Sequence, residues 1–271
     1  MERYYGTDGA SIACKAGYDE IHWQYNDKNQ IIRIEYLMNG VPVLNNKKIA
    51  ALEREYDEKN LVAVERYYGI EGERVKSSDG YSRIDRIWAD AKHASSEAWF
   101  DENDQPMALK DTYCRAEYEY DAAWNRIVER YFGADGNPIA SKVGADETRK
   151  TYNEKNQVTR IEYLLGGKPA LNSNGYAAAE RKLNEDGNVI REAYYGPENE
   201  PILNTSGYQT VIRTWADKKH VASEAYYDTD GKPVLCKDGY CRFERTYTEK
   251  GELENEKRFD LEGNEITDQQ E

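Results

Sequence analysis

An internal duplication at a distance of 127 residues constrains this chain more than any other feature. The shift aligns the following segments without a gap: "RYYGTDG" (3–9) with "RYFGADG" (130–136), "YNDKNQ" (25–30) with "YNEKNQ" (152–157), and "RIEYLMNG" (33–40) with "RIEYLLGG" (160–167). Self-similarity at a fixed period is the signature of repeat architectures, in which each repeat packs on its neighbours. The sequence therefore predicts a repeat fold before any local pattern is considered.

Each half divides again into four repeats of 31 or 32 residues. The marker is a turn position that holds Gly, Asp or Asn: Gly9, Gly40, Gly72, Asp104, Gly136, Gly167, Asn199, Gly231 and Gly263. We expect one continuous repeat array over residues 1–271, with a first four-repeat half at 3–129, a second at 130–256 and a partial terminal repeat at 257–271.

One repeat has the pattern of a β-hairpin. A segment such as "YCRFERTY" (240–247) is followed by a polar turn and then by a segment such as "LVAVERYY" (61–68). Tyr, Val, Ile and Thr favour strands, and the Gly, Asn and Asp between them favour tight turns. A helical hairpin array is the alternative, but the apolar residues do not keep a 3.6-residue period. We therefore predict an all-β, elongated tandem array of about eight β-hairpin repeats.

Arginine and glutamate vary together between the two segments of a repeat. The arginines are Arg54, Arg86, Arg181, Arg213 and Arg245, and the glutamates eleven residues later are Glu65, Glu97, Glu192, Glu224 and Glu256. The first repeat has Trp23 and Ile34 instead, whereas the repeats of Tyr118 and Lys150 break the correlation. We expect the matched residues to be diagonal neighbours on one face of a hairpin and to form structural ion pairs.

Composition excludes several classes of partner. The chain has 51 acidic and 37 basic residues and a formal net charge of -14, which repels the phosphates of nucleic acid and of anionic lipid. We expect no nucleic-acid partner. No apolar run approaches the roughly 18 residues of a membrane span, and "MERYYGTDG" lacks the apolar segment of a signal peptide. We expect no membrane insertion by this segment.

The near-identical segments "WADAKH" (88–93) and "WADKKH" (215–220) invite a catalytic interpretation. They stand where other repeats have hairpin turns such as "YNDKNQ", so we interpret them as turn variants. Acid–base or metal chemistry by Asp90 and His93, or by Asp217 and His220, would need a third group and a pocket. The sequence predicts no enzyme, no metal site and no cofactor.

The four cysteines give a weak signal. Cys14 and Cys236 share one repeat position, and Cys114 and Cys241 share another. Cys236 and Cys241 flank a short turn, so a bridge between them and a pair of free thiols both remain open.

Aromatic residues form the most conspicuous candidate site. Each second segment ends in a pair of residues, and neighbouring residues of a strand face opposite sides of a sheet. The second member of the pair admits Leu and Phe, so we expect it to be buried. The first member is Tyr or Trp until the last repeat, so we expect it to be partly exposed and to bind an extended neutral polymer, a glycan or a peptide. These predicted ligand-binding residues are Tyr36, Tyr67, Trp99, Tyr131, Tyr163, Tyr194 and Tyr226. The alternative function is a structural spacer or protein-interaction scaffold.

The turn motifs also resemble those of a known family. "YDEKN", "YNDKN", "YNEKN" and "YDAAWN", each followed by a Val/Ile segment, resemble the YD repeats of bacterial Rhs-type proteins. Residues 226–251 resemble tyrosine-rich tandem repeats of bacterial surface proteins. The resemblance implies stacked hairpins, a bacterial origin, a surface or secreted location and no catalysis by the repeats. The pattern also begins and ends without distinct caps, which predicts that the chain is a piece of a longer protein.

Overall fold

The computed structural model describes residues 1–109 and 112–266, and its regular structure there is entirely β. These residues form twenty strands and no helix, which confirms the predicted all-β class and the hairpin repeats. In this described part of the chain, no helix is long and apolar enough to cross a membrane.

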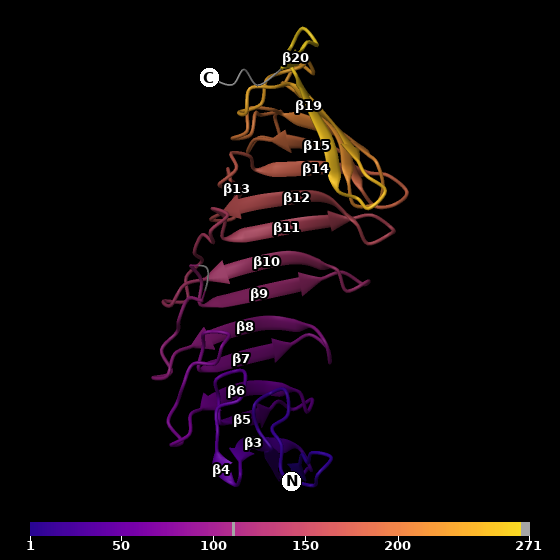
Figure 1. The fold of residues 1–271 in the computed structure, drawn as a ribbon. Coiled ribbons are helices and arrows are strands. Elements are labelled where there is room, and N and C mark those ends of the chain that lie inside the picture. Colours follow the sequence, from indigo (N-terminus) through magenta and orange to yellow (C-terminus); the bar gives the residue numbers. More distant parts are fainter. Residues whose placement is uncertain (110–111, 267–271) are drawn as a thin grey trace. The chain divides into compact units, whose positions relative to one another are not determined.

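The strands follow one pattern in every repeat (Figure 1). The strands that lead into a hairpin turn are β2 (Glu20–Tyr25), β5 (Ala51–Tyr56), β7 (Arg83–Trp88), β9 (Arg115–Tyr120), β11 (Glu147–Tyr152), β14 (Ala178–Leu183), β16 (Thr210–Trp215) and β18 (Arg242–Tyr247). The strands that leave it are β3 (Ile31–Met38), β6 (Val62–Tyr68), β8 (Ala94–Phe100), β10 (Arg126–Phe132), β12 (Val158–Leu165), β15 (Val189–Tyr195), β17 (Val221–Tyr227) and β19 (Leu253–Phe259). Four short strands complete the set: β1 (Glu2–Arg3), β4 (Val41–Pro42), β13 (Lys168–Pro169) and β20 (Glu265–Ile266).

Strand pairing makes each hairpin part of an antiparallel meander. In β5–β6, Ala51 lies opposite Tyr68 and Arg54 lies opposite Glu65, and a β-bulge precedes Tyr56. The same register and the same bulge recur in β2–β3, β7–β8, β11–β12, β14–β15, β16–β17 and β18–β19. The strand that leaves one hairpin then pairs with the strand that enters the next, as β6 does with β7.

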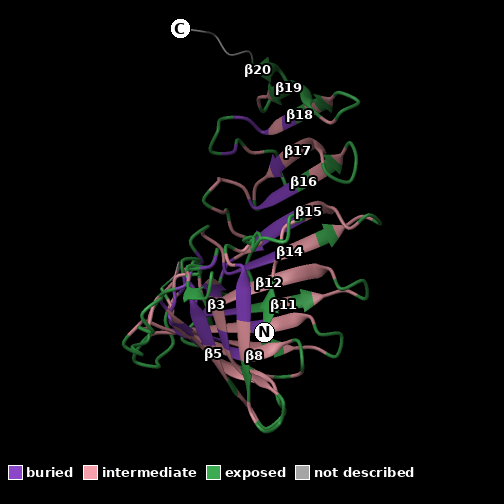
Figure 2. Ribbon diagram, turned by 60° about the horizontal axis from the view of Figure 1, so that its bottom comes forward, coloured by how far each residue is buried: buried purple, intermediate pink, exposed green. Residues whose placement is uncertain are grey.

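The chain divides into two compact units, residues 1–119 with 130–139 and residues 120–129 with 140–271. The core of the first unit includes Ile49, Leu52 and Ile84, and that of the second includes Val211 and Phe243. Within a hairpin, burial is greatest at the strand ends next to the connectors, whereas the hairpin turns are exposed (Figure 2). A single continuous array over residues 1–271 stays a prediction.

The connector between two hairpins folds back over one face of the sheet. Val75 and Tyr81 come from the connector after β6 and pack on the first core. We call the covered face, which carries Leu52, Arg54 and Tyr67, the inner face. The opposite face, which carries Glu53 and Tyr68, is the outer face.

The nine predicted turn positions all adopt positive φ, from 58° at Asp104 to 85° at Gly263. Two repeats are 31 residues long because a two-residue turn, Asn39–Gly40 in the first half, replaces a longer one. Both turn residues have positive φ, as a type I′ turn requires. The buried Asp19 carboxylate accepts a hydrogen bond from the Asn39 amide at 3.0 Å. Bonds from the Ser11 hydroxyl and the Asn39 amide hold the pKa of Asp19 below its usual value.

Candidate functional site

The predicted ligand column lies on the inner face, and much of it is buried. Tyr67, Tyr194 and Tyr226 are 5% exposed and Trp99 is 9% exposed, while the other three predicted residues are half-buried. The expectation of an exposed column is therefore wrong for these four rings. They lie under rings of the connectors, as Tyr226 does between Tyr208 and Tyr240 at 4.6 and 5.9 Å. Ligand binding through the column stays an untested prediction. The burial of these four rings removes the solvent exposure on which that prediction depended.

A glutamate explains why tyrosine is buried here. The Tyr67 hydroxyl donates to Glu65 at 2.6 Å, and the Tyr226 hydroxyl donates to Glu224 at 2.7 Å. A tyrosine hydroxyl can be buried without a large desolvation cost when it has a hydrogen-bond partner inside the protein. Burial raises the pKa of Tyr36, Tyr67, Tyr194 and Tyr226, and it raises the pKa of Tyr163 to about 12. The recurring Glu-x-Tyr or Glu-x-Trp spacing indicated the glutamate partner in the sequence, because residues two apart share a face of a strand.

The same glutamates hold the predicted arginines. The five matched pairs all form ion pairs, with N···O distances of 2.6 to 3.1 Å. The partners lie directly opposite each other, not diagonally, because the β-bulge falls between them and the turn and shifts the register only beyond them. Each repeat with a matched pair and a tyrosine thus contains a chain of contacts from arginine to glutamate to tyrosine on its inner face.

The repeats that break the sequence correlation bond to their neighbours instead. Lys150 reaches Glu129 of the preceding repeat at 2.6 Å, and the Tyr118 hydroxyl reaches Glu97 at 3.4 Å. Arg213 also contacts Glu192 of the preceding repeat at 3.4 Å. Glutamates on the inner face therefore link successive hairpins as well as the two strands of one hairpin.

The "WADAKH" and "WADKKH" segments form hairpin turns. Asp90 accepts hydrogen bonds from the amides of Lys92 and His93, and its carboxylate contacts the His93 ring at 2.9 Å. In the second copy, bonds from the His220 side chain and two backbone amides lower the pKa of Asp217 to about 2. The carboxylates thus organise the turn backbone.

Trp88 and Trp215 join one hairpin to the preceding one. Their indole N–H groups donate to the carbonyls of Val62 and Val189 at 2.8 and 3.0 Å. Tyr56, Tyr152 and Tyr247 make the same link from equivalent positions. Tyr and Trp alternate at this position because both carry a donor at the end of an aromatic ring, whereas Leu183 at the equivalent position of β14 carries none.

All four cysteines are free thiols, so no bridge joins Cys236 to Cys241. Within residues 1–109 and 112–266, no group of His, Cys, Asp and Glu side chains is arranged to hold a metal ion.

The outer face carries a second set of aromatic rings, and an arginine partly covers Tyr68, Phe100, Phe132, Tyr195 and Phe259. Arg83 lies over Phe100 at 4.5 Å and Arg115 lies over Phe132 at 3.8 Å. These rings were expected to be buried, but only the Leu37 and Leu164 side chains of this column are. The reason is that the connectors cover the inner face and leave the outer one to its own side chains.

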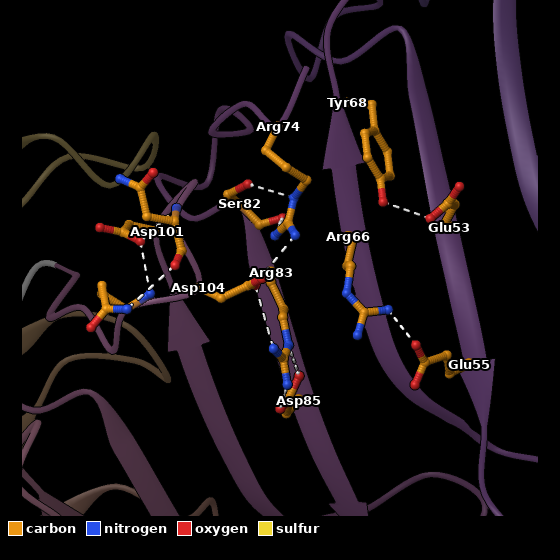
Figure 3. Close-up of polar contacts among 12 residues, drawn as sticks. Glu53, Glu55, Arg66, Tyr68, Arg74, Ser82, Arg83, Asp85, Asp101 and Asp104 are labelled. Atoms are coloured by element: carbon orange, nitrogen blue, oxygen red, sulfur yellow. Dashed lines mark hydrogen bonds and ion pairs between the residues drawn. The ribbon is translucent and has the colours of Figure 1, made fainter. Parts of the chain in front are cut away.

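Ion pairs and hydrogen bonds on the outer face join residues of one strand, of neighbouring strands and of the connectors. Arg66 pairs with Glu55 at 2.5 Å, and the Tyr68 hydroxyl donates to Glu53 at 2.6 Å (Figure 3). Arg83 pairs with Asp85 at 2.5 Å, and Arg74 pairs with Asp104 at 3.2 Å. Exposed ion pairs of this kind contribute little to stability, typically about 0–1 kcal/mol each.

Two depressions on the outer face of the second unit occupy equivalent places one repeat apart. One, of about 440 Å³, is lined by residues that include Arg160, Leu164, Pro169 and Asn199. The other, of about 490 Å³, is lined by the corresponding residues of the next repeat, which include Arg191, Tyr195, Pro201 and Gly231. The repeat thus generates a row of similar concavities.

Two further depressions lie at hairpin turns and correspond to each other after the shift of 127. They have volumes of about 420 and 360 Å³ and are lined mainly by amide and charged side chains, such as Asn26 and Asn153. Several of these amides bond to their own turn, as Asn26 does to the Lys28 and Gln30 amides.

Fold and surface together define the class: a tandem β-hairpin repeat whose connectors cover one face of the sheet. No protein-family model matches the chain, and no curated protein matches its sequence at a significant level.

Solved structures that align with this chain include those of Tc toxins. The crystal structure of TcdB2-TccC3-Cdc42 has a TM-score of 0.36 and 12% identity, covering 91% of this chain and 13% of that chain. The Tc holotoxin pore of Photorhabdus luminescens has a TM-score of 0.29 and 10% identity, covering 98% of this chain and 15% of that chain. The protein therefore spans a small part of the length of these chains, and likenesses of this strength identify no family for it.

Proposed function

We propose that this protein is a non-catalytic structural scaffold, in which the inner face holds successive hairpins together and the outer face is presented to partners. The burial of Tyr67, Trp99, Tyr194 and Tyr226 carries the proposal. A ring that stacks on a sugar must offer its face to solvent before binding. These rings pack under connectors, and the Tyr67, Tyr194 and Tyr226 hydroxyls bond to glutamates, which favours a role in holding the repeats together.

The inter-hairpin contacts support the same function. The aromatic donors at Trp88 and Trp215 reach the preceding hairpin, as do Lys150 and Arg213. Repeat proteins take most of their stability from such interfaces between neighbours. The candidate catalytic groups Asp90 and Asp217 bond to turn amides, which favours a structural role over acid–base chemistry.

Two adjacent tyrosines on opposite faces provide the test. Tyr226→Phe removes a buried hydroxyl that is bonded to Glu224, and Tyr227→Phe removes one that has no hydrogen bond among the described residues. We expect the first change to cost about 1.5–3 kcal/mol of unfolding free energy, because the acceptor is charged. The second should cost less than about 0.5 kcal/mol. Urea denaturation measures both.

A glycan array separates the scaffold from the binding module. We expect the wild-type protein to bind no neutral glycan. Binding of such a glycan that is lost in the Trp99→Ala/Tyr131→Ala double variant, while most repeats stay folded, would overturn the proposal.

A further inference from the structure

One arginine of the outer face has no acidic partner. Within the described residues, every arginine except Arg191 has a carboxylate oxygen within 4 Å. Arg191 instead donates to the Thr210 hydroxyl at 3.2 Å. In a chain with a formal net charge of -14, an arginine without a counter-ion stands out.

The strand register shows which residues stand at Arg191 in place of acidic partners. One repeat earlier, Arg160 pairs with Glu180, which lies opposite it on β14, at 2.5 Å. It also pairs with Glu162, two residues further along its own strand, at 2.9 Å. The residues equivalent to these glutamates are Ile212, which lies opposite Arg191 on β16, and Ala193.

The same pattern separates Arg191 from its other equivalent. In the first repeat, Arg33 pairs with Glu35 at 2.8 Å and with Glu53 at 2.7 Å. Both carboxylates are thus present at Arg33 and Arg160, and both are replaced by apolar residues only at Arg191.

The Arg191 guanidinium lines a concavity that offers one further uncommitted hydrogen-bond donor. Arg191 lines the depression of about 490 Å³ together with Tyr195, Thr210 and Tyr227, and with Asp230, which pairs with Lys232. The Tyr195 and Thr210 hydroxyls already donate to Glu180 and Gln209. The Tyr227 hydroxyl makes no hydrogen bond within the described residues. A planar guanidinium beside a free hydroxyl matches a carboxylate, which accepts two parallel bonds from arginine and has lone pairs to spare.

The neighbouring depression decides which carboxylate ligand fits. It lies one repeat away, a distance of about 10 Å for two strands at a spacing of about 4.8 Å. There Arg160 is already neutralised by Glu162 and Glu180, and the lining also contains Pro169 and Pro197. A polyuronate carries a carboxylate on every sugar, so it would place a further carboxylate beside these glutamates, where like charges repel.

An extended peptide meets both depressions. In the polyproline II conformation, which has three residues per turn and rises about 3.1 Å per residue, side chains three positions apart lie on the same side of the peptide and are separated by about 9 Å. We propose that the outer face at Arg191 is a docking site for an extended peptide in the polyproline II conformation, which places one Asp or Glu carboxylate on the Arg191 guanidinium and an apolar side chain, three residues away, in the depression beside Pro169. The proposal is independent of how the inner face contributes to stability.

A single exposed position tests it. Ile212→Glu places a carboxylate where Glu180 meets Arg160, so it gives Arg191 an internal counter-ion. Ile212→Gln has the same shape without the charge and is the matched control. Ile212 is 41% exposed, so both variants should fold, and circular dichroism with thermal melting checks that they do.

The probe is a phage-displayed library of random heptapeptides, selected on the full chain. We expect wild type and Ile212→Gln to enrich peptides with an acidic residue, and Ile212→Glu not to enrich them. A synthetic peptide from the enriched pool should bind about 10- to 100-fold more weakly when its acidic residue is changed to the amide.

Two results would overturn the proposal. One is an enriched pool without a preference for acidic residues, or with the same preference on Ile212→Glu. The other is binding of polygalacturonate to wild type that is lost in Ile212→Glu, which would assign the site to an acidic glycan.

Discussion

At the scale of the residue, aromatic side chains with a polar end bridge neighbouring hairpins. The Tyr56 hydroxyl donates to the Ile31 carbonyl at 2.7 Å, and Tyr247 reaches the Val221 carbonyl at 2.8 Å. These carbonyls lie at the β-bulge, where the ladder between the strands of a hairpin is irregular. At this irregular point of the hairpin, the next repeat therefore donates a hydrogen bond to the backbone carbonyl.

Removing one such hydroxyl should therefore have a measurable effect. We expect Tyr56→Phe to lower the free energy of unfolding by about 0.5–1.5 kcal/mol, the usual net value of one hydrogen bond. Tyr25→Phe is the control, because Tyr25 holds the equivalent position in the first repeat and its hydroxyl has no bond within the described residues. Chemical denaturation gives both values, and equal losses would contradict the assigned link.

The pH dependence of stability should report on Glu192. Burial alone would raise the pKa of Glu192, but Arg181, Arg213 and the Tyr194 hydroxyl outweigh it and leave the pKa below its ordinary value. A depressed carboxyl pKa stabilises the fold above the unfolded value of about 4.3, and this contribution disappears as pH falls through the folded value.

The stability difference between wild type and Glu192→Gln should therefore be full at pH 7 and shrink as pH falls below about 5. Denaturation curves at a series of pH values measure it. A difference that stays constant down to pH 3 would show that the charge of Glu192 contributes nothing.

At the scale of the element, the turns are held in shape by backbone conformation. Gly231 has a φ of 77° and nothing lies within 4 Å of where a Cβ would be. Asn199, one repeat earlier, has a φ of 63° with a side chain present. The space is open at Gly231, so only the left-handed conformation resists substitution.

We accordingly expect Gly231→Ala to cost about 1–2 kcal/mol and Gly231→Asn to cost clearly less, since asparagine adopts this conformation more readily. Thermal or urea unfolding compares the two variants. Similar costs for both would mean that contacts of the turn, and not its φ, set the preference.

Hairpins and ion pairs could be predicted from sequence because both are local. The spacing of Arg54 and Glu65 fixes a register within one hairpin, and positive φ at Gly72 follows from residue type. Which face of the sheet buries the aromatic column could not be predicted from the sequence, because it depends on where the connectors fold. A tyrosine such as Tyr67 suits a partly exposed position and a buried position equally. Only the hydrogen bond from its hydroxyl to Glu65 distinguishes the buried position from the exposed one. The diagonal placement of the ion pairs failed for a similar reason, since the bulge does not show in the residue count.

At the scale of the whole molecule, contacts between repeats suggest that stability is set by neighbours. Tyr194 packs between Tyr176 and Tyr208 at 4.5 and 5.9 Å, and both rings belong to adjoining connectors. In repeat proteins each repeat touches only the next, so a local loss spreads over a short distance. Fold stability should then vary along the chain and not fall everywhere at once.

Tyr194→Ala makes this testable by hydrogen exchange. Truncating a buried aromatic ring costs about 3–5 kcal/mol, which here falls on one repeat and its two neighbours. We expect amide exchange to accelerate in β14 to β17 and to stay unchanged in β2 to β6, which lie in the other compact unit. Tyr227→Phe, an outer-face change without a lost hydrogen bond, should leave both regions unchanged. Equal acceleration in β2 to β6 would show that the chain unfolds as one cooperative body and that the neighbour-by-neighbour description is wrong.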